Sequence, residues 1–114
     1  AGTFAKILGQ YVRDEKKLSL MQALKKMTLM PAQRLEAFVP EMNYKGRLQE
    51  GADADITIFN AATIIDKATY TKPAQASKGI EYVLVNGKPV IFDSKLIENA
   101  FPGRAVLATR PALQ

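Results

Sequence analysis

The densest group of side chains that could bind a metal ion lies near the middle of the chain. Glu50, Asp53 and Asp55 place three carboxylates close together, and carboxylate oxygens are the ligands that calcium and magnesium prefer. Their spacing does not match an EF-hand loop, and the Ile-Thr-Ile-Phe run at 56–59 favours a strand over a coordinating loop. We therefore expect a structural role, in which Asp53 and Asp55 accept hydrogen bonds from nearby backbone N–H groups.

The absence of two residue types limits the chemistry further. The 114 residues include no histidine and no cysteine, although catalytic zinc usually takes these ligands together with carboxylates. Nucleophilic triads need a base that is usually histidine. Two carboxylates could do glycosidase-type chemistry, but the acids are scattered in polar contexts, and no phosphate-binding glycine motif occurs. We expect this segment to hold no catalytic residue, no cofactor-binding residue and no metal ligand.

The net charge of +5 raises the question of an anionic partner. Basic residues occur as pairs at 16–17 and 25–26 or singly, with acidic residues among them, and aromatic residues are not interleaved with them. No apolar run approaches the ~20 residues of a membrane span. We expect a solvated surface, a cytoplasmic location, and neither a nucleic-acid nor a membrane partner.

The first forty residues have helical periodicity. Apolar residues recur at positions 4, 7, 8, 11 and 12, which predicts a helix that starts after Gly2-Thr3 and ends in the polar run 13–17. Ser19 and Gln22 form a capping box for a second helix. The buried stripe expected for that helix comprises Leu20, Ala23, Leu24 and Met27.

Prolines mark the end of this helical part. Pro31 suits the first turn of a third, short helix through Leu35, because the N–H that proline lacks has no partner there. Pro40 is expected to close the helical part. The methionines at 21, 27, 30 and 42 have helical spacing, which favours core or interdomain packing over a promiscuous binding surface.

From residue 44 onward the sequence favours strands. Residues 54–59 alternate, with Ile56 and Ile58 on one face, and the runs 82–85 and 89–92 flank Asn86-Gly87, a strong hairpin signal. Tyr70 and Tyr82 are expected to be half-buried strand aromatics. Helices followed by strands predict an α+β fold. So few short strands leave open edges, which suggests that the sheet needs partner strands this chain does not supply.

Residues 45–59, from Lys45 to Phe59, resemble the C-terminal signature of the amidohydrolase superfamily. Segment 27–35 resembles the helix pair that precedes this signature in the superfamily. Segments 63–70 and 79–87, with Pro73 and Gln75 between them, are similar to its N-acyl-D-amino-acid deacylase branch, the D-aminoacylases and D-glutamate deacylases. Segment 2–13 resembles the start of a late barrel helix in that branch. The chain departs from the pattern at Asn60, where aspartate is common, and at 93–99, which lacks the usual glycines.

The resemblance implies a parent enzyme that hydrolyses the amide of N-acyl-D-amino acids with water activated by zinc or another divalent metal. Residues 1–40 would be late helices of its (β/α)8 barrel, and residues 41–114 the β-rich part of a composite, incomplete β-sandwich. The metal ligands would lie upstream of residue 1.

On this hypothesis the partners of the segment are the barrel and the N-terminal strands of the same polypeptide. The isolated chain is expected to be inactive and to self-associate. Two alternatives stay open. The parent could resemble a dihydroorotase or hydantoinase, since these relatives share the 45–59 signature, or the chain could be a self-standing, non-enzymatic interaction module.

Overall fold

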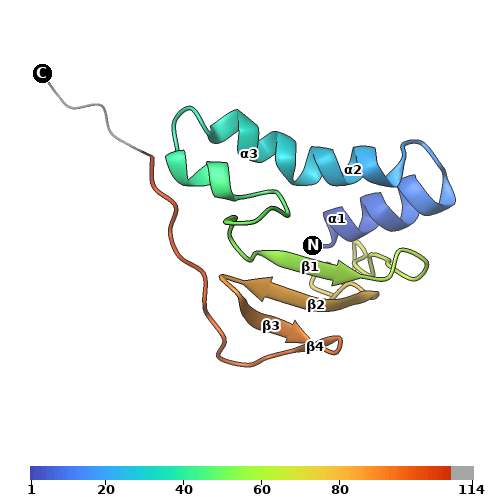
Figure 1. The fold of residues 1–114 in the computed structure, drawn as a ribbon. Helices are drawn as coiled ribbons and strands as arrows, with labels where there is room; N and C mark the ends of the chain where they lie inside the picture. Colours follow the sequence, from blue (N-terminus) through green and yellow to red (C-terminus); the bar gives the residue numbers. More distant parts are fainter. Residues whose placement is uncertain (109–114) are drawn as a thin grey trace, which may run out of the picture.

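The computed structural model describes residues 1–108; residues 109–114, the end of the predicted β-rich part, lie outside the described residues. Helices come first and a four-stranded antiparallel sheet follows, which confirms the predicted α+β order (Figure 1). No helix among the described residues is long and apolar enough to cross a lipid bilayer. The elements are α1 (Thr3–Lys6), the π-helix η1 (Ile7–Asp14), α2 (Leu20–Met27), α3 (Leu29–Leu35), the 3-10 helix η2 (Pro40–Tyr44), β1 (Ile56–Phe59), β2 (Ile80–Val85), β3 (Lys88–Phe92) and β4 (Lys95–Leu96).

The first helix begins where the sequence predicts but winds differently. Gly2 precedes α1 with a φ of 77°, a left-handed conformation that glycine adopts without strain. A Cβ there would also lie 2.0 Å from a carboxylate oxygen of Asp66. The helix continues as η1 to Asp14, and the Glu15 N–H donates to the Gln10 carbonyl at 2.8 Å, an i→i−5 bond. The last turns are therefore wider than those of an α-helix.

The predicted capping box starts α2. The Gln22 N–H donates to Ser19 Oγ at 3.2 Å, and the Ser19 N–H donates to Gln22 Oε1 at 3.0 Å. These bonds satisfy N–H groups that the start of a helix leaves unpaired. Thr28 joins α2 to α3, and its hydroxyl donates to the Leu24 carbonyl at 2.7 Å. Pro31 lies in the first turn of α3, as predicted.

The prediction that Pro40 closes the helical part is wrong. Pro40 is the first residue of η2, which extends to Tyr44. Proline suits this position because its fixed φ is helical and the N–H that it lacks would have no partner. The helical region therefore leads directly into the segment that begins at Lys45.

The sheet has the strand order β1-β2-β3-β4, with every neighbouring pair antiparallel. Asn86 and Gly87, with φ of 51° and 73°, lie between β2 and β3. Asp93 and Ser94, with φ of 50° and 64°, connect β3 to β4. Positive φ at both central residues matches the right-handed twist of the strands. The sequence does not predict β4, because neither Asp93 nor Ser94 is a glycine.

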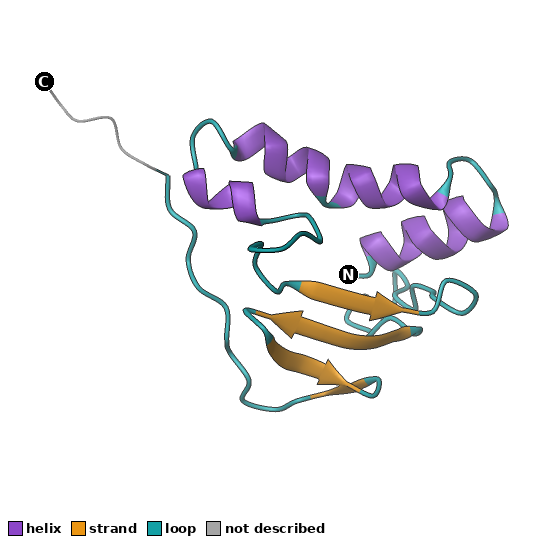
Figure 2. Ribbon diagram, in the orientation of Figure 1, coloured by secondary structure: helices purple, strands orange, loops and turns teal. Residues whose placement is uncertain are grey.

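Ile56 and Ile58 share one side of β1, since side chains alternate along a strand. Ile58 is 46% exposed, whereas Ile56 is half-buried and lines the cleft between the sheet and the helices. On the other side Phe59 packs against the core, and Thr57 borders the same cleft. Figure 2 shows the helices lying beyond β1, with β3 and β4 on the far side of the sheet.

The hydrophobic core is small. Its buried members are Ala5, Leu8, Ala23 and Ile64, and within residues 1–108 only Ile64 among the larger side chains is almost fully covered, at 2% exposure. Many large apolar side chains are exposed instead, among them Phe4, Leu48, Phe92, Leu96 and Phe101.

The methionines and tyrosines only partly follow the expectation. Met27 packs against the core, whereas Met21 and Met30 are exposed in this chain, so that interdomain packing of these two stays a prediction. Tyr82 is half-buried in β2, with its ring edge-on to Phe92 at 5.2 Å between centroids. Tyr70 is fully exposed because it lies in the loop between β1 and β2 and not in a strand.

Candidate functional site

Lys45 brings together the two aspartates that the sequence analysis considered as metal ligands. Its Nζ lies 2.9 Å from Asp53 Oδ2 and 2.6 Å from Asp55 Oδ2. Asp55 Oδ1 also accepts the Asn86 N–H at 2.9 Å, across 31 residues. The expected structural role is therefore correct for Asp55, although the N–H that it binds is distant in sequence. Asp55 ties together the segment after η2, the start of β1 and the turn between β2 and β3.

The electrostatics of this cluster follow from its contacts. The hydrogen bond to Asp55, with a second to Asp53, raises the pKa of Lys45 above its ordinary value. Partial burial opposes ionisation of Asp55, but the hydrogen bonds from the Asn86 N–H and from Lys45 outweigh it and lower the pKa of that carboxyl. Both groups are therefore charged around neutral pH and hold each other in place.

The residues present do not fit a metal ion. Within residues 1–108 there is no group of three or more His, Cys, Asp or Glu side chains placed to share one. The ammonium of Lys45 lies between Asp53 and Asp55, where a cation would have to bind. Glu50 is exposed and shares no hydrogen bond or ion pair with this cluster in the part of the chain described.

Arg47 connects the same segment to the helices. Its Nη2 pairs with Glu36 Oε1 just after α3, and its Nε donates to the Lys45 carbonyl at 3.0 Å. Gly46 has a φ of 70°, and a Cβ there would lie 2.4 Å from the Thr28 carbonyl oxygen. The Lys-Gly-Arg run is therefore a structural junction between helices and sheet. These pairings are not predicted from the sequence, although the opposite charges of Lys45 and Asp55 are a signal that could indicate one of them.

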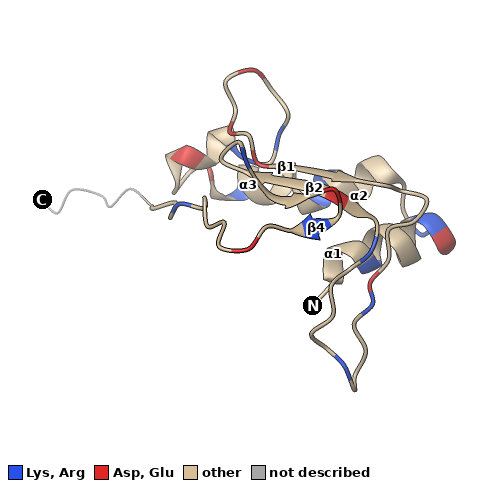
Figure 3. Cartoon of the chain, turned by 90° about the horizontal axis from the view of Figure 1, so that it is seen from below, with Lys and Arg blue, Asp and Glu red and all other residues tan. Residues whose placement is uncertain are grey.

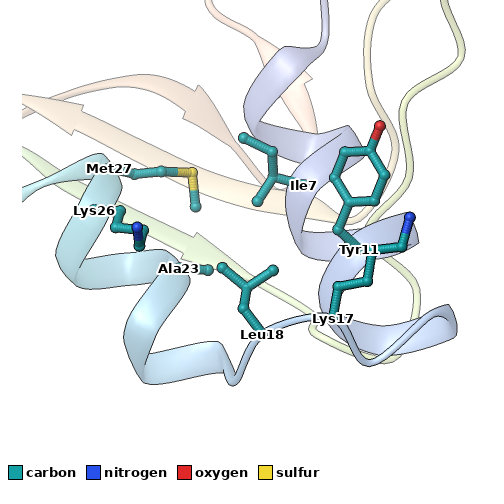
Figure 4. Close-up of a pocket in the computed structure, with 7 residues that line it drawn as sticks. All are labelled: Ile7, Tyr11, Lys17, Leu18, Ala23, Lys26 and Met27. Atoms are coloured by element: carbon teal, nitrogen blue, oxygen red, sulfur yellow. The ribbon is translucent and has the colours of Figure 1, made fainter.

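A shallow hollow of about 480 Å³ lies between η1 and α2. Figure 4 shows Ile7 and Met27 pointing toward each other from the two helices, with Tyr11 and Lys17 at one end. Lys17 lies over the Tyr11 ring at 5.1 Å and also pairs with Glu15 at 2.6 Å. The lining is mainly apolar and offers neither a nucleophile with a base nor a pair of acids.

A second cleft, of about 530 Å³, separates the helices from β1 and β2. Phe4, Leu24 and Met27 line it from the helices, and Thr57, Phe59 and Val83 line it from the strands. The two charged residues along it are Arg47 and Asp55, each already paired within the chain. Figure 3 shows that other charged residues are spread over helices, strands and loops. The described residues thus form two mainly apolar clefts, and the charged residues along the second are held in ion pairs within the chain.

Comparison with known proteins identifies the family. A sequence profile described as the amidohydrolase family matches residues 2–91. The chain belongs to the amidohydrolase family. Its similarity to the N-acyl-D-amino-acid deacylase branch is also confirmed. N-acyl-D-glutamate deacylase of Alcaligenes xylosoxydans xylosoxydans is 46% identical over 86 residues, which are 75% of this chain and 17% of that relative. N-acyl-D-aspartate deacylase of the same organism is 37% identical over 112 residues, 98% of this chain and 21% of that relative.

Solved structures agree with this assignment to the amidohydrolase family. The N-acyl-D-glutamate deacylase of Bordetella bronchiseptica, crystallised with zinc and a phosphonate inhibitor, matches with a TM-score of 0.69 and 43% identity over 77% of this chain and 18% of that chain. A D-aminoacylase described as having a binuclear metal centre matches with a TM-score of 0.76 and 34% identity, covering 85% of this chain and 19% of that chain. The chain therefore spans about a fifth of the length of these family members.

Proposed function

We propose that this chain is the C-terminal supporting segment of a longer, metal-dependent amidohydrolase that hydrolyses the amide of N-acyl-D-amino acids. The observation that carries the proposal is the 37–46% identity to deacylases of which the chain spans only 17–21%. A match of this kind is expected of one part of a larger enzyme. The segment contributes structure, and the residues that do the chemistry belong to the remainder.

The exposed apolar side chains of this chain are consistent with a segment that packs against the rest of a larger enzyme. In the longer enzyme, residues 1–40 would pack as late helices of a (β/α)8 barrel, and residues 41–114 would form part of a composite β-sandwich. Exposed apolar side chains occur on both parts, for example Met21 at 72% on α2 and Phe92 at 57% on β3. Side chains of this kind are usually covered by a neighbouring layer.

The metal chemistry of such an enzyme must come from outside these residues. A bound divalent metal lowers the pKa of its water and polarises the acyl carbonyl. Because the Lys45 ammonium already lies between Asp53 and Asp55, and no third carboxylate joins them, this chain offers no ligand set for that ion among the described residues. No step of the reaction is therefore assigned to a residue of this segment.

The test is a comparison of two proteins: the 114-residue chain and the longest polypeptide that its gene encodes. Both would be incubated with N-acetyl-D-glutamate, N-acetyl-D-aspartate and a neutral N-acetyl-D-amino acid, with the L-enantiomers as controls. We expect release of acetate by the longer protein only, and only from D-substrates. Activity on dihydroorotate or a hydantoin in place of these substrates would favour the other amidohydrolase parent. Equal deacylation by the 114 residues would refute the supporting role.

If the chain is instead a non-enzymatic interaction module, we expect its gene to encode a much shorter protein. If it encodes only about 114 residues, no barrel can be present, and a binding function becomes the better hypothesis. Self-association of the isolated chain, its lack of a nucleic-acid or membrane partner and its cytoplasmic location stay predictions. Light scattering of the purified chain over a dilution series tests the first of them.

A further inference from the structure

Three hydrogen bonds fix the turn between β2 and β3 to distant parts of the chain. The Asn86 N–H donates to Asp55 Oδ1 at 2.9 Å, and the Gly87 N–H donates to the Ala54 carbonyl oxygen at 2.9 Å. The side-chain amide of Asn86 donates from Nδ2 to the Pro102 carbonyl oxygen at 2.7 Å. The main chain of the turn is therefore bound to the segment before β1, and one side chain binds it to the segment after β4.

The segment after β4 depends on this side-chain bond. It passes the turn between β2 and β3 on its way to the end of the described chain (Figure 1). Within residues 1–108, the bond to Pro102 is the one hydrogen bond that segment 98–108 makes. Phe101 and Leu107 of this segment are 88% and 72% exposed, so that their packing adds little to hold it in place.

Asn86 and Gly87 also form the one Asn-Gly pair in the sequence. In such a pair the main-chain nitrogen of the glycine can attack the side-chain amide carbon Cγ of the asparagine, because glycine has no Cβ to obstruct the approach. The attacking nitrogen gives up its proton, a new C–N bond closes a five-membered imide ring, and the side-chain nitrogen leaves as ammonia. Water then opens the ring at one of its two carbonyl carbons, which gives aspartate or isoaspartate.

The folded turn holds both reacting groups back from this reaction. The Gly87 N–H, which must lose its proton, is bonded to the Ala54 carbonyl, and the Asn86 amide, which must turn toward Gly87, is bonded to Pro102. Gly87 is exposed and Asn86 is only half-buried, so water and hydroxide reach both residues whenever the turn opens. Local opening of the turn, without global unfolding, is therefore enough for the reaction.

The product cannot form the bond to Pro102 again. A carboxylate has no proton to donate at neutral pH, so an aspartate at position 86 would place its charge against the Pro102 carbonyl oxygen. The Asp55 carboxylate, which accepts the main-chain N–H of the same position, adds a second negative charge nearby. Both contacts are repulsive, and an isoaspartate would also lengthen the main chain of the turn by one methylene group.

We propose that Asn86-Gly87 is a deamidation site, and that conversion of Asn86 to aspartate or isoaspartate releases segment 98–108 from the sheet. The proposal does not depend on the deacylase function, because it rests only on the chemistry and the hydrogen bonds of this turn. Since ammonia is lost, each molecule makes the change once and does not return.

The rate of conversion tests the first half of the proposal. The 114-residue chain is incubated at mildly alkaline pH in buffer and in urea, and peptide mass spectrometry separates asparagine, aspartate and isoaspartate at each position. The asparagines at 43, 60 and 99 precede tyrosine or alanine and are internal references. We expect Asn86 to be converted faster than these references in both solutions, and at least about 10-fold more slowly in buffer than in urea, because the turn must open first.

Gly87→Ala is the control for the chemistry. In urea it should slow the conversion of Asn86 several-fold, because its Cβ obstructs the attacking nitrogen. Conversion of Asn86 no faster than that of the references would overturn the deamidation site. Equal rates in buffer and in urea would overturn the protective role of the two hydrogen bonds.

Backbone NMR relaxation tests the release of segment 98–108. In the original chain the order parameters of Gly103 and Arg104 should lie near those of the strands. In the purified deamidated chain and in Asn86→Asp they should fall below about 0.6, the range of flexible backbone. Asn86→Gly permits the same positive φ and removes the donor without adding a charge, so it separates the lost bond from charge repulsion, and we expect release here too.

The order parameters of β1, β2 and β3 show in each sample whether the sheet is intact. If Asn86→Asp does not fold, Asn86→Gly and the deamidated chain still decide the question. An intact sheet with an ordered segment in these samples would overturn the release. A segment that is already flexible in the original chain would overturn it as well, since the Asn86 side chain would then hold nothing in place.

Discussion

The Arg13 guanidinium donates from Nη1 to the Ile64 carbonyl oxygen at 2.6 Å, across 51 residues of sequence. Gly9 reaches the same group from η1: a Cβ there would lie 2.4 Å from the Ile64 oxygen. A Cβ at Gly79, just before β2, would lie 2.5 Å from the Cα of Ile64. Ile64 is thus the point at which the first helix, the loop after β1 and the start of β2 meet.

Arg13→Ala should lower the free energy of unfolding of the 114-residue chain by about 1–2 kcal/mol. The substitution leaves a partly buried carbonyl without its charge-assisted partner. Arg34→Ala is the matched control, because Arg34 is exposed and has no salt bridge within residues 1–108. Urea unfolding followed by circular dichroism measures both, and equal losses for the two variants would contradict the role of Arg13.

Gly9→Ala should destabilise the chain by about 1–3 kcal/mol, because its methyl group cannot fit against the Ile64 carbonyl without a shift of backbone. Gly103→Ala adds the same methyl group where no atom lies within 4 Å. We expect this control to stay within about 0.5 kcal/mol of the original chain. If Gly9→Ala were equally neutral in thermal unfolding, η1 would not pack against the loop as closely as described.

Ser19→Ala should cost about 1 kcal/mol of stability, since it removes the oxygen that accepts the Gln22 N–H. Ser19→Asp keeps an acceptor at the cap and should retain most of the stability. Thermal unfolding of the original chain, Ser19→Ala and Ser19→Asp gives the order of their stabilities. A destabilisation by aspartate as large as that by alanine would contradict the capping role.

The ion pair of Lys45 and Asp55 predicts how stability depends on pH. The pKa of Asp55 is lowered in the folded chain, so its contribution is present above about pH 4 and is lost as pH falls through the folded pKa. The pKa of Lys45 is raised, so its contribution is present below about pH 10 and is lost as pH rises through the folded pKa.

Asp55→Asn tests this dependence. At pH 7 the variant should be less stable by roughly 1 kcal/mol, a modest value because the carboxylate is partly exposed to solvent. The difference should shrink as the pH falls below about 4 and vanish once the pH has passed through the lowered pKa of Asp55, where the carboxyl is protonated in the folded chain as well. Urea unfolding between pH 2.5 and 8 measures the difference, and a constant gap at all pH values would contradict the ionic origin.

Removal of metal should affect the longer polypeptide but not the 114-residue chain. A chelator such as EDTA is expected to abolish deacylation by the longer polypeptide, with recovery on addition of zinc. The same treatment should leave the melting temperature of the 114-residue chain unchanged, because it offers no ligand set among its described residues. A melting temperature that rises with zinc would contradict this.

The features that sequence predicts best here are local. The capping box needs only Ser19 and Gln22 three residues apart, and Pro31 needs only the first turn of α3, so both are found as predicted. The turn at Asp93 and Ser94 was missed because neither residue is the glycine that usually marks positive φ. Its conformation is fixed by the pairing of β3 with β4.

The features that sequence misses depend on distant parts of the chain. The bond that Asp55 accepts comes from Asn86, which only the β1–β2 register brings close. Met21 is exposed because it lies on the side of α2 that no other part of the described chain covers. Helical spacing predicts that apolar residues share a side of the helix, but it does not predict which side is covered. The resemblance of residues 45–59 to a known family predicts the family correctly, whereas residue spacing alone does not. It does so because this continuous run of sequence forms the junction between the helices and the sheet.

The π-helical winding of η1 limits which changes of chain length this segment can accept. Gly9 and Arg13 both reach the Ile64 carbonyl, and their spacing of four residues suits the wider turns of η1. Deleting one residue between them would rotate everything downstream by about 100° of helix, which carries the arginine away from that carbonyl. A relative with one residue fewer between these positions could not form the Arg13–Ile64 hydrogen bond. We therefore expect the length of η1 and the arginine at this position to be kept or lost together.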